Sequence, residues 1–342
     1  MDTNRRSFIR TTSLVGIGGM FSPHIAFSQK KVSAPQGKRV GIIGLDTSHC
    51  VAFTKALNNP SMEQDFYGYK VVAAYPYGSK DIESSVSRIP GYSNEVKKYG
   101  VEIVGSIGDL LGKVDAVLLE TNDGRLHLEQ ALPVFKAGKR MFIDKPIAAS
   151  LSDAMAIFEA SKQYNVPVFS SSSLRYIEGA KEIIDGEIGN VLGADTYSPA
   201  AIEKTHPDLF WYGIHGIEAL FTVMGLGCKR VVRVHTENTD IVVGTWQDNR
   251  IGTFRGVRSG KCGFGGSVFG DKGVKVLGGY NGYNPLLIKI VEFFNSGIPP
   301  VTPEETLEII AFMEAAEESK NKGGVSVELN HVVQNAKKEI IK

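Results

Sequence analysis

The chain has 342 residues, of which 42% are hydrophobic and 22% charged, which suits a soluble globular protein of about two domains. Its 38 basic and 37 acidic residues are balanced, which argues against nucleic-acid binding and against an acidic disordered tail. The cysteines, Cys50, Cys228 and Cys262, lie far apart without a C-x-x-C pair. A cysteine zinc site is therefore not expected, although one disulfide is possible.

The N-terminus carries the features of an export signal. Residues 4–10 read NRRSFIR and resemble a twin-arginine signal, and the weakly apolar run at 14–21 is too short to span a bilayer. Residues 26–28, AFS, suit a signal cleavage site. We therefore expect residues 1–28 to be read by the twin-arginine export machinery. The destination is the periplasm or beyond, with a membrane anchor if the signal is kept; a basic disordered tail is the alternative.

Strand and helix patterns alternate between residues 38 and 147. Alternation with short loops predicts an α/β fold in which a Rossmann-like, doubly wound parallel sheet forms the N-terminal domain, 38–147. The expected strands are 39–44, 70–74, 101–104, 115–120 and 140–144, and the expected helices are 50–57, 107–111 and 126–137.

The turn after the first strand is where a dinucleotide fold shows G-x-G-x-x-G. Gly44 takes the first glycine position, but Asp46 and His49 take the second and third. A carboxylate at the second position would repel a pyrophosphate. The helix start, with Thr47 and Ser48, still offers N–H groups and hydroxyls to an anion. These five residues form a candidate cofactor site, with dinucleotide binding left open.

The ends of the second and fourth strands also face this crevice. Residues 75–80, YPYGSK, contain neither the acidic residue typical of NAD binding nor the arginine that suits NADP, so the two remain undistinguished. The loop 121–127 holds Thr121, Asn122 and His127, which we expect to contact a ligand.

Asp144-Lys145-Pro146 closes the fifth strand. A lysine at the carboxyl end of a strand in an open α/β sheet points into the ligand crevice. Pro146 ends the strand because it lacks an N–H.

Together, the first strand through Gly44, the loop and helix at 121–138, and Asp144-Lys145-Pro146 resemble the Gfo/Idh/MocA family of oxidoreductases. The last motif matches the family's E-K-P with Asp for Glu. The resemblance implies hydride transfer between NAD or NADP and a sugar or cyclitol carbon, with Asp144 near the cofactor. It also implies that Lys145 lies beside the nicotinamide and the substrate hydroxyl, where it assists proton removal.

The resemblance implies a second, open-faced α/β domain at 148–342, whose last helices pack back on the first. Here we expect helices at 151–164, 286–295 and 304–320, and a glycine-rich, mostly antiparallel sheet whose outer face makes a homo-oligomer. The strands expected in this sheet are 192–198, 230–235, 241–246, 251–257, 262–269 and 274–277.

The family's D-x-x-x-H helix motif places His215 as the second catalytic residue, an acid/base. Trp211 takes the aspartate position, which leaves simple alcohol dehydrogenation in question. The resemblance also puts the neighbours of these two residues in the substrate site. The further substrate-site candidates are Arg175, Tyr176, His206 and Glu218.

A metal held by His215, Glu218 and His206 is a less favoured alternative, so no metal is expected. Three functions remain open. The favoured one is an exported NAD(P)-dependent sugar oxidoreductase. The second cleaves a glycosidic bond through a transient redox step on tightly bound NAD. The third is a non-redox protein that has lost the cofactor.

Overall fold

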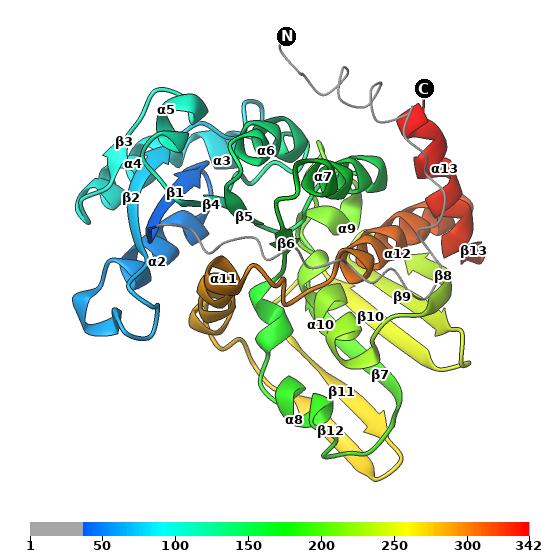
Figure 1. The fold of residues 1–342 in the computed structure, drawn as a ribbon. Coiled ribbons are helices and arrows are strands. Elements are labelled where there is room, and N and C mark those ends of the chain that lie inside the picture. Colours follow the sequence, from blue (N-terminus) through cyan, green and yellow to red (C-terminus); the bar gives the residue numbers. More distant parts are fainter. Residues whose placement is uncertain (1–36, 342) are drawn as a thin grey trace.

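The computed structural model of the protein describes residues 37–341, so the export signal expected at 1–28 lies outside the described residues. Two sheets with their helices make up this part of the chain (Figure 1). No helix within residues 37–341 is long and apolar enough to cross a membrane. Cys50, Cys228 and Cys262 are all free thiols in the described chain.

The first sheet has six parallel strands in the order β3-β2-β1-β4-β5-β6. This confirms the doubly wound sheet that the strand–helix alternation predicts. The order reverses between β1 and β4, so the crevice lies at the carboxyl ends of those strands. The strands are β1 (Arg39–Ile43), β2 (Lys70–Tyr75), β3 (Glu102–Ile103), β4 (Ala116–Leu119), β5 (Arg140–Ile143) and β6 (Val168–Ser170).

This sheet continues past the expected domain boundary at residue 147. Strand β6 pairs in parallel with β5, Met141 lying opposite Val168. The connection between them is a helix that packs back on the sheet, as a parallel crossover requires. The N-terminal sheet therefore includes a strand that the sequence had placed in the second domain.

Helices cover both faces of the first sheet. Leu110, Val134 and Ile157 pack on one face, whereas Phe53 and Val96 pack on the other. The sequence did not predict the two short helices after β2, because they contain too few apolar residues to give a helical pattern. The helices are α2 (Ser48–Leu57), η1 (Pro60–Met62), α3 (Glu83–Val86), α4 (Ile89–Lys97), α5 (Ile107–Leu111), α6 (His127–Lys136) and α7 (Leu151–Tyr164).

The second sheet has seven strands in the order β12-β11-β7-β10-β9-β8-β13. Only β7 and β10 pair in parallel among these strands, which confirms a mostly antiparallel sheet. The strands are β7 (Val191–Pro199), β8 (Cys228–His235), β9 (Thr239–Trp246), β10 (Ile251–Val257), β11 (Gly265–Gly270), β12 (Gly273–Leu277) and β13 (Val327–Glu328).

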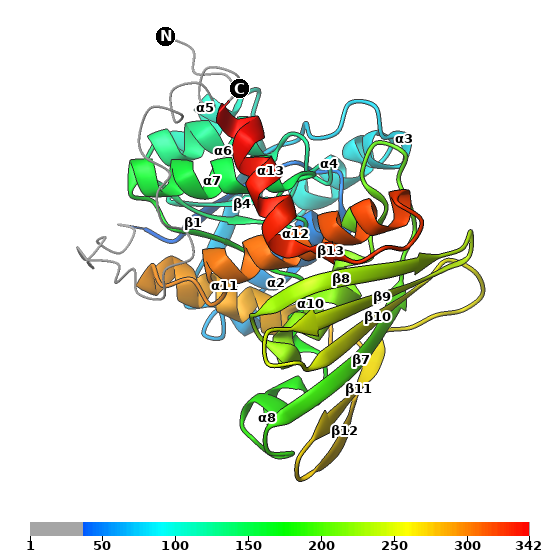
Figure 2. The same cartoon turned by 90° about the vertical axis from the view of Figure 1, so that its right-hand side faces the viewer.

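The remaining helices pack beside this sheet or return to the first domain (Figure 2). Leu286 and Phe293 of α11 share a core with Val40 of β1, as expected for a returning helix. The segment expected to be one helix around His215 is broken between α9 and α10. These elements are η2 (Ser173–Tyr176), α8 (Ala180–Ile184), α9 (Asp208–Trp211), α10 (Ile214–Met224), α11 (Asn284–Ser296), α12 (Pro303–Asn321) and α13 (Leu329–Ile341).

Candidate active site

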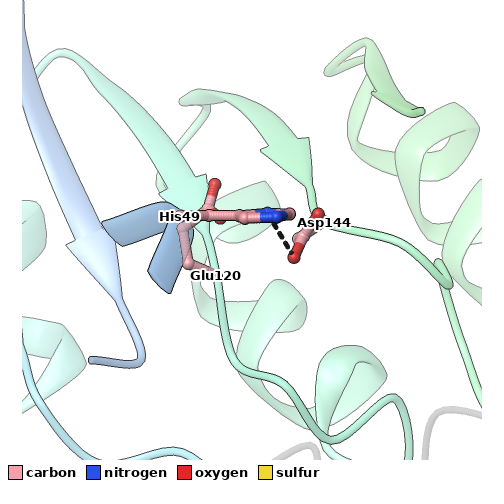
Figure 3. Close-up of side chains that lie close together, drawn as sticks. All are labelled: His49, Glu120 and Asp144. Atoms are coloured by element: carbon pink, nitrogen blue, oxygen red, sulfur yellow. Dashed lines mark ion pairs between the residues drawn. The ribbon is translucent and has the colours of Figure 1, made fainter. Parts of the chain in front are cut away.

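Three ionisable side chains meet at the carboxyl edge of the first sheet (Figure 3). Glu120 directly follows β4, Asp144 directly follows β5, and His49 lies in the first turn of α2. Their exposed fractions are 0%, 0% and 6%. His49 Nδ1 lies 2.9 Å from Asp144 Oδ2 and 3.7 Å from Glu120 Oε2. We call this group the crevice triad.

The crevice triad is short of hydrogen bonds. Both carboxylate oxygens of Glu120 and of Asp144, and Nδ1 of His49, are buried without an aligned hydrogen-bond partner in the described chain. Burial and the nearby Asp144 raise the pKa of Glu120 well above its usual value. Burial also raises the pKa of Asp144, but His49 and Lys145 outweigh it and hold that pKa below its usual range.

Lys145 lies against the crevice triad, as the sequence predicts for the end of the fifth strand. Its side chain is only 8% exposed, and Nζ is 3.7 Å from Asp144 Oδ2. The ammonium group therefore faces a carboxylate inside the crevice rather than bulk water.

His215 approaches the same place from the second domain. It lies in the first turn of α10, is 6% exposed, and its Nδ1 is 2.7 Å from Ser172 Oγ. Burial lowers its pKa well below the ordinary value, and Lys145 and His49 lower it further. The imidazole is therefore neutral near pH 7.

Glu218 and Arg175, expected to contact substrate, are bound to other protein groups instead. Glu218 accepts hydrogen bonds from Ser171 Oγ at 2.7 Å, from Ser172 N at 2.8 Å and from Arg175 Nε at 2.9 Å. Arg175 Nη1 donates to Glu305 at 2.7 Å. This buried ion-pair network ties η2 to α10 and α12, and through Ser172 it holds His215 in place.

Asp46 does not face the crevice as a free carboxylate. It is 0% exposed, and Oδ1 accepts from Asn122 N at 2.9 Å. Its Oδ2 accepts from Ser79 N and Ser79 Oγ, both at 2.8 Å. The repulsion of a pyrophosphate predicted from sequence is therefore weakened, because three donors stabilise the charge below the loop surface.

The turn before α2 retains two features of a phosphate site. Gly44 has φ +88°, and a Cβ there would lie 2.5 Å from Thr121 N, so only glycine fits. Thr47 precedes α2 and makes no side-chain cap bond to it in the described chain, and Ser48 is exposed. The N–H groups of the first turn thus remain available for an anion.

Three residues expected to contact the cofactor use their side chains inside the protein. His127 is fully buried, with its ring nitrogens 3.0 Å from Ile147 O and 2.6 Å from Thr121 O. Thr121 Oγ1 donates to Gln130 at 2.6 Å. Asn122 Nδ2 donates to Ser85 at 3.0 Å. These contacts fix the loop after β4, so these side chains shape the crevice rather than line it.

His206 and Trp211 form a separate contact between the domains. Their rings are 5.3 Å apart, and His206 Nε2 is 3.4 Å from Asp123 Oδ1 in the loop after β4. Trp211 ends α9 and Tyr212 leaves helical geometry at φ −136°, so Trp211 is not on the helix face of His215 as expected. His206 and Glu218 have different partners, so the alternative metal set does not form.

Aromatic rings connect the two histidines across the site, and sequence reasoning missed them. Ring centroids are 4.6 Å apart for His49–Tyr283, 5.4 Å for Tyr283–Tyr280, 6.3 Å for Tyr280–Phe264 and 6.0 Å for Phe264–His215. We call Tyr283, Tyr280 and Phe264 the aromatic wall. Tyr176, the remaining expected substrate residue, packs partly buried against the N-terminal core.

Glu120 was also missed, although the sequence held a signal for it. It is the charged residue that ends a fully apolar strand, Ala116–Leu119, in the position that faces the crevice. The aromatic wall had no such signal, because its members lie in loops or at element edges whose contacts depend on how the domains meet.

Comparison with known proteins supports the N-terminal domain. Residues 38–172 match the family model GFO_IDH_MocA, described as an oxidoreductase family with an NAD-binding Rossmann fold. The chain is 28% identical over 164 residues to inositol 2-dehydrogenase 3 of Saccharopolyspora erythraea, covering 46% of this chain and 43% of that protein. It is 32% identical over 100 residues to 1,5-anhydro-D-fructose reductase of Ensifer adhaerens, covering 28% and 30%. The chain thus matches less than half the length of these relatives.

Solved structures share the whole fold. Scyllo-inositol dehydrogenase from Lactobacillus casei, solved with NAD(H) and scyllo-inositol, has a TM-score of 0.69 at 16% identity. The likeness covers 86% of this chain and 100% of that one. A probable dehydrogenase from Thermotoga maritima has a TM-score of 0.70 at 20% identity, covering 86% of this chain and 99% of that one. This chain therefore shares the fold of both domains with these structures.

Proposed function

We propose that this chain, whose residues 38–172 carry the NAD-binding Rossmann domain of Gfo/Idh/MocA oxidoreductases, is an NAD(P)-dependent oxidoreductase of a sugar or cyclitol. The observation that carries the proposal is the burial of Lys145 beside Asp144 and Glu120 at the carboxyl edge of the first sheet. Ligands of open α/β sheets bind at that edge. His215, from α10 of the second domain, is buried as well.

The residues present fit a dinucleotide in a rearranged phosphate site. The N-terminus of α2, with Thr47 and Ser48, would receive the pyrophosphate, and Asp46 braces the loop from below. When bound, the cofactor supplies the hydride acceptor or donor for a substrate carbon. We propose, as the resemblance implies, that Asp144 lies near the bound cofactor.

Lys145 and His215 would handle the hydroxyl proton of the substrate. His215 is neutral and hydrogen-bonded through Nδ1 to Ser172, which leaves Nε2 as the atom that exchanges a proton. Lys145 Nζ would hold the substrate oxygen through a hydrogen bond as charge develops on it. The hydride step needs this proton transfer, because an alcohol carbon becomes a carbonyl.

The aromatic wall supports a sugar-like substrate. Tyr280 is 40% exposed and stands between Tyr283 and Phe264, so part of an aromatic side chain is open to a ligand. Aromatic rings pack well against the apolar C–H face of a cyclic polyol, while its hydroxyls meet polar groups. Relatives named for inositol and anhydrofructose point to the same substrate class.

The first test is mass spectrometry of the denatured protein for released NAD(H) or NADP(H). A stoichiometric dinucleotide would support the tightly bound cofactor. A screen of sugars and cyclitols then follows absorbance of the reduced cofactor together with the reaction products. Bond cleavage without net cofactor change would favour the transient-redox alternative, and failure to bind added NAD or NADP would reject both redox functions.

The role of Lys145 is tested by Lys145→Met. We expect kcat to fall at least about 100-fold, because a positioned acid or base contributes roughly 10²–10⁴-fold. The matched control is Lys136→Met, an exposed lysine at the end of α6, which should keep its rate. An unchanged kcat in folded Lys145→Met would reject the proposed role.

The open face of the second sheet supports a homo-oligomer. The register puts exposed hydrophobic side chains on the face opposite α10 and α12, namely Tyr197, Val234, Ile251, Phe269, Val274 and Val276. Ile251→Lys with Val276→Lys should lower the mass measured by light scattering. The control is Ile184→Lys, an exposed apolar residue ending α8.

Export to the periplasm belongs to the proposal as well, supported by the residues RR in the first ten positions. Cell fractionation should find the protein outside the cytoplasm. Replacing both Arg5 and Arg6 by lysine should retain it inside. Retention of the wild type in the cytoplasm would reject export.

A further inference from the structure

We propose that His49, Glu120 and Asp144, the crevice triad, form a binding site for one divalent metal ion. One imidazole nitrogen and two carboxylates come from three separate elements and converge on a single point. Their ligand atoms all lie within 4.8 Å of one another. The proposal adds a bound cation to the crevice and does not depend on whether a dinucleotide binds there.

The geometry matches the edges of a coordination shell. Ligands held about 2.1 Å from a metal in octahedral arrangement are about 3 Å apart at neighbouring positions. The separation of His49 Nδ1 from Asp144 Oδ2 is 2.9 Å, and from Glu120 Oε2 it is 3.7 Å. The first pair is in ion-pair contact but lacks hydrogen-bond alignment, so both atoms point toward a common position.

The unpaired carboxylates are a second, independent indication. Glu120 is 0% exposed and neither of its oxygens has a hydrogen-bond partner within residues 37–341. Buried carboxylates are normally hydrogen-bonded or coordinate a metal, because an isolated buried charge is costly. The alternative, a proton shared by Glu120 and Asp144, would need a direct contact, and no oxygen of either is hydrogen-bonded to the other.

Charge balance favours a cation as well. Lys145 is the nearby ammonium group, and its Nζ is 3.7 Å from Asp144 Oδ2. One lysine offsets one of the two carboxylates, and His49 can serve as a ligand only when it is neutral. A divalent ion would neutralise the remaining acid and add attraction for an anionic or hydroxyl-bearing ligand.

The ligand set narrows the class of metal. One nitrogen with two carboxylate oxygens suits Mn²⁺, Fe²⁺ or Zn²⁺ better than Ca²⁺, which prefers six to eight oxygens. Three protein ligands leave coordination positions open, as in catalytic rather than structural sites. Those positions would be available to an oxygen atom of a substrate held between Lys145 and the aromatic wall.

The test is a calorimetric titration of Mn²⁺ into the full chain, purified and then freed of metal with a chelator. Mn²⁺ electron spin resonance gives a second readout, since the signal of the free ion disappears on binding. We expect one saturable site per chain, whose Mn²⁺ affinity rises with pH because the ion must displace protons from its ligands. Zn²⁺ should compete for the same site.

The variants Glu120→Gln and Asp144→Asn should each weaken Mn²⁺ binding at least tenfold. The matched control is Glu314→Gln, which replaces another largely buried carboxylate, on α12, that accepts a bond from Leu151 N. Its Mn²⁺ affinity should equal that of the wild type. Circular dichroism checks that each variant is folded, and if one fails to fold, the other carries the comparison.

Absence of saturable Mn²⁺ or Zn²⁺ binding by the folded wild type would overturn the proposal. So would unchanged affinity in a folded Glu120→Gln or Asp144→Asn variant. NAD and NADP titrations of the same chelator-treated protein separate this result from the proposed function. Dinucleotide binding without metal binding would reject the metal site alone, and the reverse would reject the cofactor alone.

Discussion

Two buried clusters of charge in this protein differ in how well their members are paired. In the second domain, Arg233 is fully buried, and its guanidinium donates to Asp240, Glu317 and Asp208, each at 2.8 Å. Asp240 also bonds to His235 and Arg258. In the crevice triad, by contrast, the carboxylates of Glu120 and Asp144 lack hydrogen bonds in the described structure.

The difference separates a cluster that supports the fold from one that is available to a ligand. Arg233 joins β8 to β9, α9 and α12, so its bonds connect elements that the sheet alone would not hold. The crevice triad also comes from three elements, but only ion-pair contacts through His49 join its members, and no hydrogen bond does. Buried charges without hydrogen bonds are unfavourable, and they persist at functional sites because the surrounding structure holds them in place.

The largest effect should come from removing the centre of the paired cluster. Arg233→Met keeps much of the side-chain volume but leaves buried acids without their donor, so we expect a loss of about 3–5 kcal/mol in unfolding free energy. Urea denaturation measures it. The control Arg255→Met, on the exposed face of β10, should change stability by less than about 0.5 kcal/mol. A loss below about 1 kcal/mol for Arg233→Met would contradict the comparison.

Glu314 is an intermediate case, a largely buried carboxylate with one backbone donor. Burial raises its pKa to about 7 from 4.5. The folded state therefore binds more protons than the unfolded state between these values, and stability falls as pH rises through that window. We expect the shifted pKa of Glu314 to lower the free energy of unfolding by about 2 kcal/mol by about pH 8. The full shift would give a larger loss, but the side chain is partly exposed and solvent weakens the effect.

That contribution is isolated by measuring the wild type and Glu314→Gln by urea denaturation on either side of the window. The glutamine still accepts from Leu151 N but does not titrate, so the difference between the two proteins should depend on pH. A constant difference across the range would show that the carboxyl group is not perturbed.

The smallest effect, and one of opposite sign, should come from the crevice triad. In chelator-treated protein, Glu120→Gln removes an unpaired buried acid and supplies an amide donor next to Asp144. We expect stability to stay equal or to rise by about 1 kcal/mol, while Mn²⁺ binding is lost. If Glu120→Gln instead lowers the free energy of unfolding by more than about 1 kcal/mol, Glu120 stabilises the fold, as the acids around Arg233 do.

Much of the fold could be predicted from local pattern. The strands β1, β2, β4, β5 and β10 were expected within one or two residues of their observed ends. Their signals are short apolar runs between turn residues, which need no knowledge of distant contacts. The short helices α3 and α4 and the final helix α13 were missed. The expected domain boundary at 147 also separated β6 from the sheet that it joins, because strand order depends on partners far along the chain.

The candidate site was predicted in part. Lys145 and His215 were proposed through motif resemblance, and the structure buries both, Lys145 beside Asp144 and His215 beside Ser172. Arg175 and Glu218 were expected at the substrate but pair with each other, since a sequence does not reveal which buried charges find partners. Asp46 was expected to disturb a phosphate, and its burial under three donors could not be seen without the loops after β2 and β4.

By itself, the sequence determined the alternation of strands and helices, the order of the two domains and the glycine in the turn between β1 and α2, because these depend on neighbours along the chain. Only the tertiary structure decided which charges are paired. Glu120 and Asp144 follow apolar strands in the same way, yet their shared crevice with His49 arises from strand order and helix placement. Pairing depends on distances between segments, and packing of the whole chain sets those distances.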